Sequence, residues 1–80
     1  MLVDNVTSNE ILHIQGKDVN LSWPIFSKIL ILEDCNVSLP VRQERVRVLV
    51  LYRCKISGSI KRMFPNLLVL DLMETESFPT

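Results

Sequence analysis

The sequence predicts a solenoid of short parallel β-strands with little helix, in one domain that spans residues 1–80. Three observations lead to this prediction. The chain has only 80 residues, 48% of them are hydrophobic, mostly Leu, Ile and Val, and one spacing of apolar residues recurs four times. A composition this apolar argues against disorder. Because a single repeat cannot bury its own apolar side, we expect the four copies to stack and to share one continuous core.

The best-formed copy of the repeat is residues 46–56, V-R-V-L-V-L-Y-R-C-K-I. Its apolar residues alternate, and alternate residues of a strand point to the same side. Leu49 and Leu51 therefore face one way, toward a core. Cys54 follows where the strand ends and a turn begins, and Ile56 is the last apolar residue of the repeat.

The other copies repeat this spacing before and after residues 46–56. We expect strands near 10–15, 28–33, 47–52 and 68–73. Equivalent leucines lie 18, 19 and 21 residues apart and should form one buried row, which consists of Leu12, Leu30, Leu49 and Leu70. A second buried row should consist of Ile14, Leu32, Leu51 and Leu72.

Turns separate the copies. Pro24, Pro40 and Pro79 stop helices and favour extended chain before them, and Gly58 permits a turn at little steric cost. We expect the return segments to be extended or 3₁₀-helical, with one helical turn within 59–64. Their apolar residues, expected to pack under the strands, are Ile25, Phe26, Val41, Ile60, Met63 and Phe64.

This frame resembles the leucine-rich repeat, L-x-x-L-x-L-x-x-N/C-x-L. Residues 46–56 match every position if Val and Ile replace Leu, residues 30–37 match its second half, and residues 65–75 are similar to repeats of intracellular immune receptors and F-box proteins. The resemblance implies an α/β-type leucine-rich-repeat solenoid of about four repeats, with short parallel strands in a right-handed superhelix. It also implies that the concave sheet face binds a protein, as in immune or receptor-type recognition.

The sequence departs from the family in three ways. The intervals of 18 and 19 are short, and Lys17 stands where Asn or Cys belongs. No terminal cap is recognisable, although stacked repeats need caps at their ends. Two interpretations stay open: a fragment of a longer array, or a small protein that closes its edge by self-association.

The outward residues of the strands are the predicted protein-binding site. The predicted contact residues are His13, Ile31, Glu33, Val48, Val50, Tyr52, Arg53, Asp71 and Met73. The middle of this face is apolar and its rim is charged, which indicates a contact surface. The alternative is that Ile and Val there reflect β-propensity alone, or are covered by a further segment.

The basic segment 42–62 carries seven Lys and Arg residues against Glu44 alone, although the formal net charge of the chain is zero. It leaves nucleic-acid binding as a third function, after protein binding and self-association. We favour it least, because no aromatic residues alternate with the cations to stack bases.

The two cysteines, Cys35 and Cys54, occupy the same repeat position. Buried structural thiols that donate to turn carbonyls are the favoured interpretation. A disulfide between neighbouring coils is the second, and a metal site is the third, because two Cys and the distant His13 do not make four ligands. We expect no metal and no cofactor.

We also expect no catalytic residues. His13 is the sole histidine, and its predicted cross-strand neighbour is Ile31, which is neither a nucleophile nor an acid. No phosphate-binding loop or nucleophile elbow is present in the sequence. The chain is therefore expected to be a non-enzyme.

Three N-glycosylation sequons begin at Asn5, Asn20 and Asn36. They favour a secreted protein slightly, but the first ten residues show no signal-peptide pattern and the thiols are expected to be unpaired. The compartment therefore stays open. No apolar stretch approaches the ~20 residues of a membrane-spanning helix.

Overall fold

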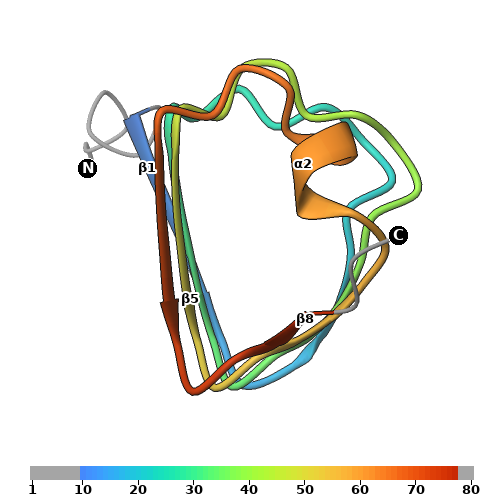
Figure 1. Cartoon of the computed structure of the whole chain (residues 1–80), viewed down its shortest axis with the longest axis vertical. Helices are drawn as coiled ribbons and strands as arrows, with labels where there is room; N and C mark the ends of the chain where they lie inside the picture. The colour runs from blue at the N-terminus through green and yellow to red at the C-terminus, as the bar shows by residue number, and fades with distance from the viewer. Residues whose placement is uncertain (1–9, 78–80) are drawn as a thin grey trace, which may run out of the picture.

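The computed structural model describes residues 10–77, which wind into a parallel β-solenoid of about three turns with almost no helix (Figure 1). The predicted solenoid of parallel strands is therefore confirmed. One long strand from each coil joins a sheet in the order β1-β3-β5-β7. The bounds of these strands are Ile11–Gln15 for β1, Ile29–Glu33 for β3, Val48–Tyr52 for β5 and Val69–Met73 for β7. Each strand begins one residue later than predicted.

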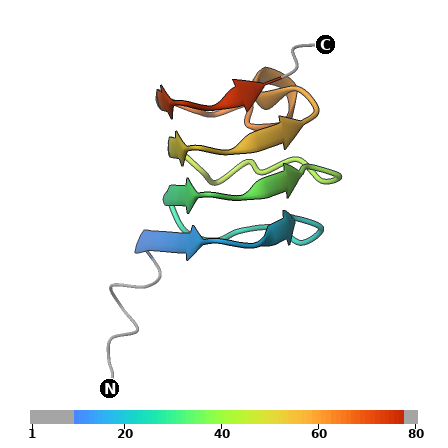
Figure 2. The same ribbon diagram turned by 90° about the horizontal axis from the view of Figure 1, so that it is seen from below.

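The coils stack in chain order, with the β1 coil and the β7 coil at opposite ends (Figure 2). The register is the predicted one: Leu30 pairs with Leu12 on one side and with Leu49 on the other, and Leu49 also pairs with Leu70. We call this the long-strand sheet and name each coil after its long strand.

A second parallel sheet, which we call the short-strand sheet, was not predicted. Its strands are β2 (Asp18–Asn20), β4 (Asn36–Ser38), β6 (Lys55–Ser57) and β8 (Glu76–Ser77), in the order β2-β4-β6-β8. In β2, β4 and β6 the middle residue, which is Val19, Val37 and Ile56 respectively, is buried between two exposed residues. One apolar residue between two exposed ones is too short a pattern to show period two, so the sequence predicts a turn here instead of a strand.

The core lies between the two sheets and the returns. Leu30, Leu32, Leu49 and Leu51 are at most 1% exposed. The returns contribute Ile25, Ile60 and Phe64, all of them buried. The predicted helical turn is also confirmed: α2 (Ile60–Met63) is capped by Ser59, whose hydroxyl accepts a hydrogen bond from the Arg62 N–H at 3.3 Å.

Two burial predictions are wrong. Phe26 was expected under the strands, but its side chain is 65% exposed and Ile25 takes the buried place. Leu70 and Leu72 were expected in the two buried rows and have the right register, yet each is 44% exposed. The reason is that a row is buried only where a coil lies on both sides of it.

Candidate functional site

The outer face of the long-strand sheet carries the predicted contact residues. Along each inner strand the side chains alternate between fully buried and half-exposed, so the half-exposed set points away from the core. One row of this face is aliphatic across all four strands and consists of Ile11, Ile29, Val48 and Val69. The next row consists of His13, Ile31, Val50 and Asp71. The apolar middle of the face therefore extends over four strands.

One rim of the outer face is ordered by a cluster around Arg53. Its guanidinium lies 4.4 Å from the centre of the Tyr52 ring, and its Nε lies 2.9 Å from the Asp34 carboxylate. Cation–π stacking and a charge-assisted hydrogen bond each restrict the long Arg side chain. The two side chains that most often dominate binding, Tyr and Arg, are thus held in place beside the apolar rows.

His13 and Glu33 meet at the side of the face near the β1 end. The His13 Nε2 lies 3.2 Å from the Glu33 Oε1. Ile31 is the register partner of His13, as predicted, but the carboxylate comes from two residues further along β3. The contact couples the first two coils across the face.

Each long strand ends at a sharp corner with one residue in the left-handed region. The φ angles are 70° at Gly16, 55° at Asp34, 53° at Arg53 and 50° at Glu74. Only glycine adopts this conformation without cost, and other residues pay about 1–2 kcal/mol. Three of the four corners therefore have a strained backbone and an exposed side chain at the rim of the outer face.

Backbone hydrogen bonds join successive corners. The corner N–H of Gly16 donates to Glu33 O at 2.8 Å, that of Asp34 to Tyr52 O at 2.9 Å, and that of Arg53 to Met73 O at 2.9 Å. Each corner N–H thus points toward the coil that follows it. The stack consequently has a direction, which matters for its two ends.

The cysteine thiols donate to backbone carbonyls, although these acceptors lie in the last two residues of a long strand and not in the turns that were predicted. The Cys35 thiol donates to Glu33 O at 3.1 Å, and the Cys54 thiol to Leu32 O at 3.2 Å. Both are free and 2% exposed. Thr75 continues the ladder, because its hydroxyl lies 3.0 Å from Leu51 O. Burial raises the pKa of the Cys54 thiol above its usual range, so this thiol stays neutral.

Gln43 is a structural residue that sequence reasoning missed. Its side chain is completely buried in the return before β5. Its Oε1 accepts from the Ile25 N–H at 2.8 Å, and its Nε2 donates to Trp23 O at 2.9 Å and Leu21 O at 3.4 Å. These hydrogen bonds join this return to the preceding one, which is irregular, and so take the place of strand pairing between them. No periodicity marks this position, so the sequence alone carried no signal for it.

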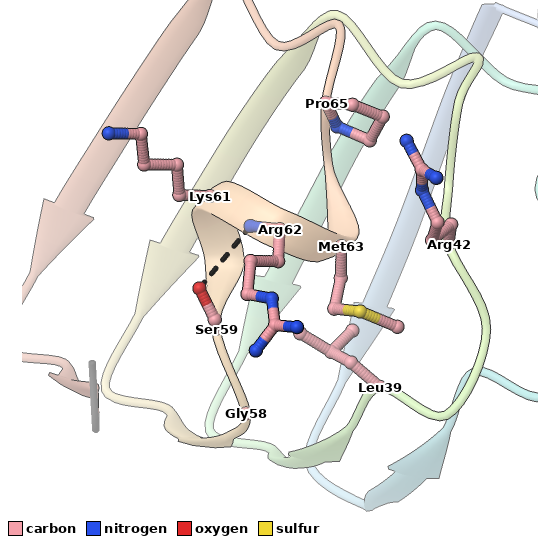
Figure 3. A pocket seen from close by; sticks show the side chains of 8 residues that line it. All are labelled: Leu39, Arg42, Gly58, Ser59, Lys61, Arg62, Met63 and Pro65. Carbon is pink, nitrogen blue, oxygen red and sulfur yellow. Dashed lines mark hydrogen bonds between the residues drawn. The ribbon is translucent and has the colours of Figure 1, made fainter. Parts of the chain in front are cut away.

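The cations of the basic segment 42–62 fall in separate places. Arg53 pairs with Asp34, and Arg45 lies 4.6 Å from the centre of the Phe26 ring. Arg42, Lys61 and Arg62 line a cleft of about 690 Å³ beside α2, but Lys61 points away from the two arginines (Figure 3). Arg42 also lies 4.0 Å from the Glu44 carboxylate.

Two of the three sequon asparagines lie within the described residues. Asn20 and Asn36 are exposed on the short-strand sheet, away from the outer face. The Asn36 side-chain amide donates to the Asp18 carboxylate at 2.9 Å. Asn5 lies outside the described residues.

No family model matches the chain, and comparisons with curated proteins and with solved structures find no match either. Within residues 10–77, no three His, Cys, Asp or Glu side chains come together as a metal site. Over the same span, no helix is long and apolar enough to cross a membrane.

Proposed function

We propose that this chain is a non-catalytic protein-binding module of the leucine-rich-repeat type, with a right-handed superhelix, that binds its partner through the outer face of the long-strand sheet. Immune or receptor recognition is the kind of role such a face would serve. One observation carries the proposal: the aliphatic row that crosses all four strands on the solvent side of the sheet. Open sheets of soluble proteins usually place polar residues there.

The arrangement of the face supports the same proposal. An apolar centre with an ordered polar rim is the usual anatomy of a protein interface. Here Val48 and Val50 are half-buried at the centre, while Tyr52 and Arg53 stand at the rim. Because Arg53 is already held by Asp34, less side-chain freedom is lost when a partner binds.

The repeat frame supports the leucine-rich-repeat assignment. Cys35, Cys54 and Thr75 hold the position of the family's Asn or Cys and make the turn contacts that this position needs. A right-handed path is the expected one, because crossovers between parallel neighbouring strands are right-handed in about 98% of cases.

Selection of peptides against the chain tests the binding face. A random peptide library displayed on phage would be panned against the immobilised protein, and the enriched peptides would be measured by titration calorimetry. We expect Val50→Lys to abolish their binding, since it puts a charge at the centre of the face. Ser57→Lys lies on the short-strand sheet of the same coil and is the matched control, which should bind as the unchanged chain does.

Circular dichroism of both variants would show that the fold is kept. Equal binding to the unchanged chain and to Val50→Lys would refute the outer face as the site. Nucleic-acid binding through 42–62, the third function, would instead show as affinity for an oligonucleotide that falls steeply with salt.

A further inference from the structure

Within residues 10–77, the β7 end of the stack is an uncovered cross-section of the core. Leu70 and Leu72 continue the two buried rows but are each 44% exposed, whereas their partners Leu49 and Leu51 are 1% exposed. With Phe64, Leu67 and Ile60, they line a hollow of about 460 Å³. Among the described strands, β7 pairs on one side only, with β5. This end therefore offers an apolar surface and a free strand edge together.

The shape that fits such an end is another coil of the same frame. Every internal contact of the long-strand sheet joins two strands of this frame in one fixed register. The β1 end of the same chain presents that frame, with Leu12 and Ile14 half-buried in the same two rows. From these two ends we infer that copies of this chain associate head to tail, with the β1 coil of one copy on the β7 coil of the next.

The hydrogen bonds at the corners favour this polarity. Each inner corner N–H donates to the carbonyl at the end of the next long strand. By the same rule the Glu74 N–H at the β7 end faces outward as a donor, and the Gln15 carbonyl at the β1 end is the matching acceptor. A head-to-tail contact joins this donor to this acceptor. A contact between two β7 ends would bring two such donors together.

Charge favours the same arrangement. Continuing the register places Asp71 of one copy opposite His13 of the next. The imidazole of His13 already reaches a carboxylate on a neighbouring strand, that of Glu33, at 3.2 Å. In an antiparallel pairing of two β7 strands centred on Asp71, two carboxylates would face each other instead.

The contact is heterologous, so it leaves one free end of each kind on every assembly. Such contacts build open chains unless they close into a ring. Sedimentation velocity over a concentration series should therefore show a continuous rise in mass rather than a single dimer. A monomer at every concentration would overturn the inference.

Two single variants block one end each. Asp71→Lys removes the carboxylate that would face His13 and puts an ammonium in its place. His13→Asp places a carboxylate opposite Asp71 at the β1 end. Both positions are exposed, so the fold should be kept, which circular dichroism would verify. Each variant alone should lose the concentration-dependent rise in mass.

Mixing the two variants gives the decisive result. In an equal mixture the intact β1 end of Asp71→Lys meets the intact β7 end of His13→Asp, and the introduced ammonium and carboxylate face each other at the alternate contact, so the rise in mass with concentration should return. Association of His13→Asp by itself would show pairing between β7 ends and would overturn the head-to-tail arrangement. The double variant His13→Asp/Asp71→Lys should associate again, because the introduced carboxylate and ammonium attract.

Leu70→Lys and Val50→Lys separate this inference from the proposed binding function. Leu70→Lys changes the β7 end and should abolish association while the selected peptides still bind. Val50→Lys lies in an inner strand and should keep the association. Loss of association in Val50→Lys but not in Leu70→Lys would place the self-contact on the outer face and overturn the inference.

Discussion

The β5 coil and the β7 coil carry the same frame but bury it to different degrees. Leu49 and Leu51 are 1% exposed, and Leu70 and Leu72, their register partners, are 44% exposed. The local sequences are nearly interchangeable, so the difference comes from the neighbours. Among the strands that the structure describes, β5 lies between two and β7 beside one. In a solenoid, the free energy of unfolding is approximately the sum of a contribution from each coil and a contribution from each contact between neighbouring coils. The β7 coil lacks such a contact on one side.

The largest expected effect comes from removing the same atoms in both coils. Leu49→Ala should lower the free energy of unfolding by about 2–5 kcal/mol, because it leaves a cavity in the core. Leu70→Ala should lower it by less than about 1 kcal/mol, since much of that side chain is already in water. Urea unfolding at a concentration where the chain is monomeric measures both. Equal losses would mean that something covers the β7 end.

The returns allow a second comparison, between two amide side chains. Gln43→Leu should cost about 1–3 kcal/mol, because the Ile25 N–H and the Trp23 carbonyl lose their partner inside the protein. Asn66→Ala should cost about 0.5 kcal/mol or less, because Asn66 is exposed and water can replace its bond to Glu44 O. Thermal unfolding of the two variants would rank their losses of stability. An unchanged midpoint for Gln43→Leu would show that the buried hydrogen bonds of Gln43 do not stabilise the fold.

A third comparison is between two corner residues, at which substitutions should change stability in opposite directions. Gly16→Ala should destabilise by about 1 kcal/mol, because φ is 70° there. A Cβ at Gly16 would meet no atom within 4 Å, so the cost is that of the backbone alone. Glu74→Gly should stabilise by up to about 1 kcal/mol, because it relieves the same strain at the other end. Destabilisation by Glu74→Gly would show that the left-handed corner carries no strain there.

The smallest expected effect is a pH dependence from Cys54. Burial raises the pKa of this thiol in the folded chain, so the unfolded chain releases its proton first as the pH rises. The stability from the neutral thiol is fully present below the unfolded pKa and is lost as the pH rises through the folded pKa. The difference in unfolding free energy between the unchanged chain and Cys54→Ser should therefore narrow at alkaline pH. If the difference in unfolding free energy stayed constant with pH, this would contradict a raised pKa of the Cys54 thiol in the folded chain.

The long-strand sheet could be predicted because its signal is repeated. Leu30 and Leu49 each sit in a five-residue alternation, and equal spacing fixed their register as well as their side. In the short-strand sheet, β2, β4 and β6 each have one inward residue, such as Val37, and three residues do not establish a period. Gln43 is buried because three backbone groups of another return need it, which is a property of the packed returns and not of its own segment.

The candidate face followed from the same register, so its rows could be written down from the sequence. The register did not predict the conformations of the side chains in these rows. The stacking of Arg53 on Tyr52 and its pairing with Asp34 depend on the left-handed corners, where Asp34 and Arg53 have positive φ without being glycine. Arg usually avoids this conformation, so the residue type of Arg53 carries no sequence signal for it.

The most direct test of the difference between the coils is residue-resolved amide hydrogen exchange of the dilute, monomeric chain. The N–H groups of β3 and β5 lie between two neighbouring coils and should exchange slowest, near the rate of global unfolding. Those of β7 should exchange at least about tenfold faster, because its coil can detach without opening the others. Protection of β7 equal to that of β5 in the monomer would contradict the account that neighbouring coils, and not the frame itself, bury the core.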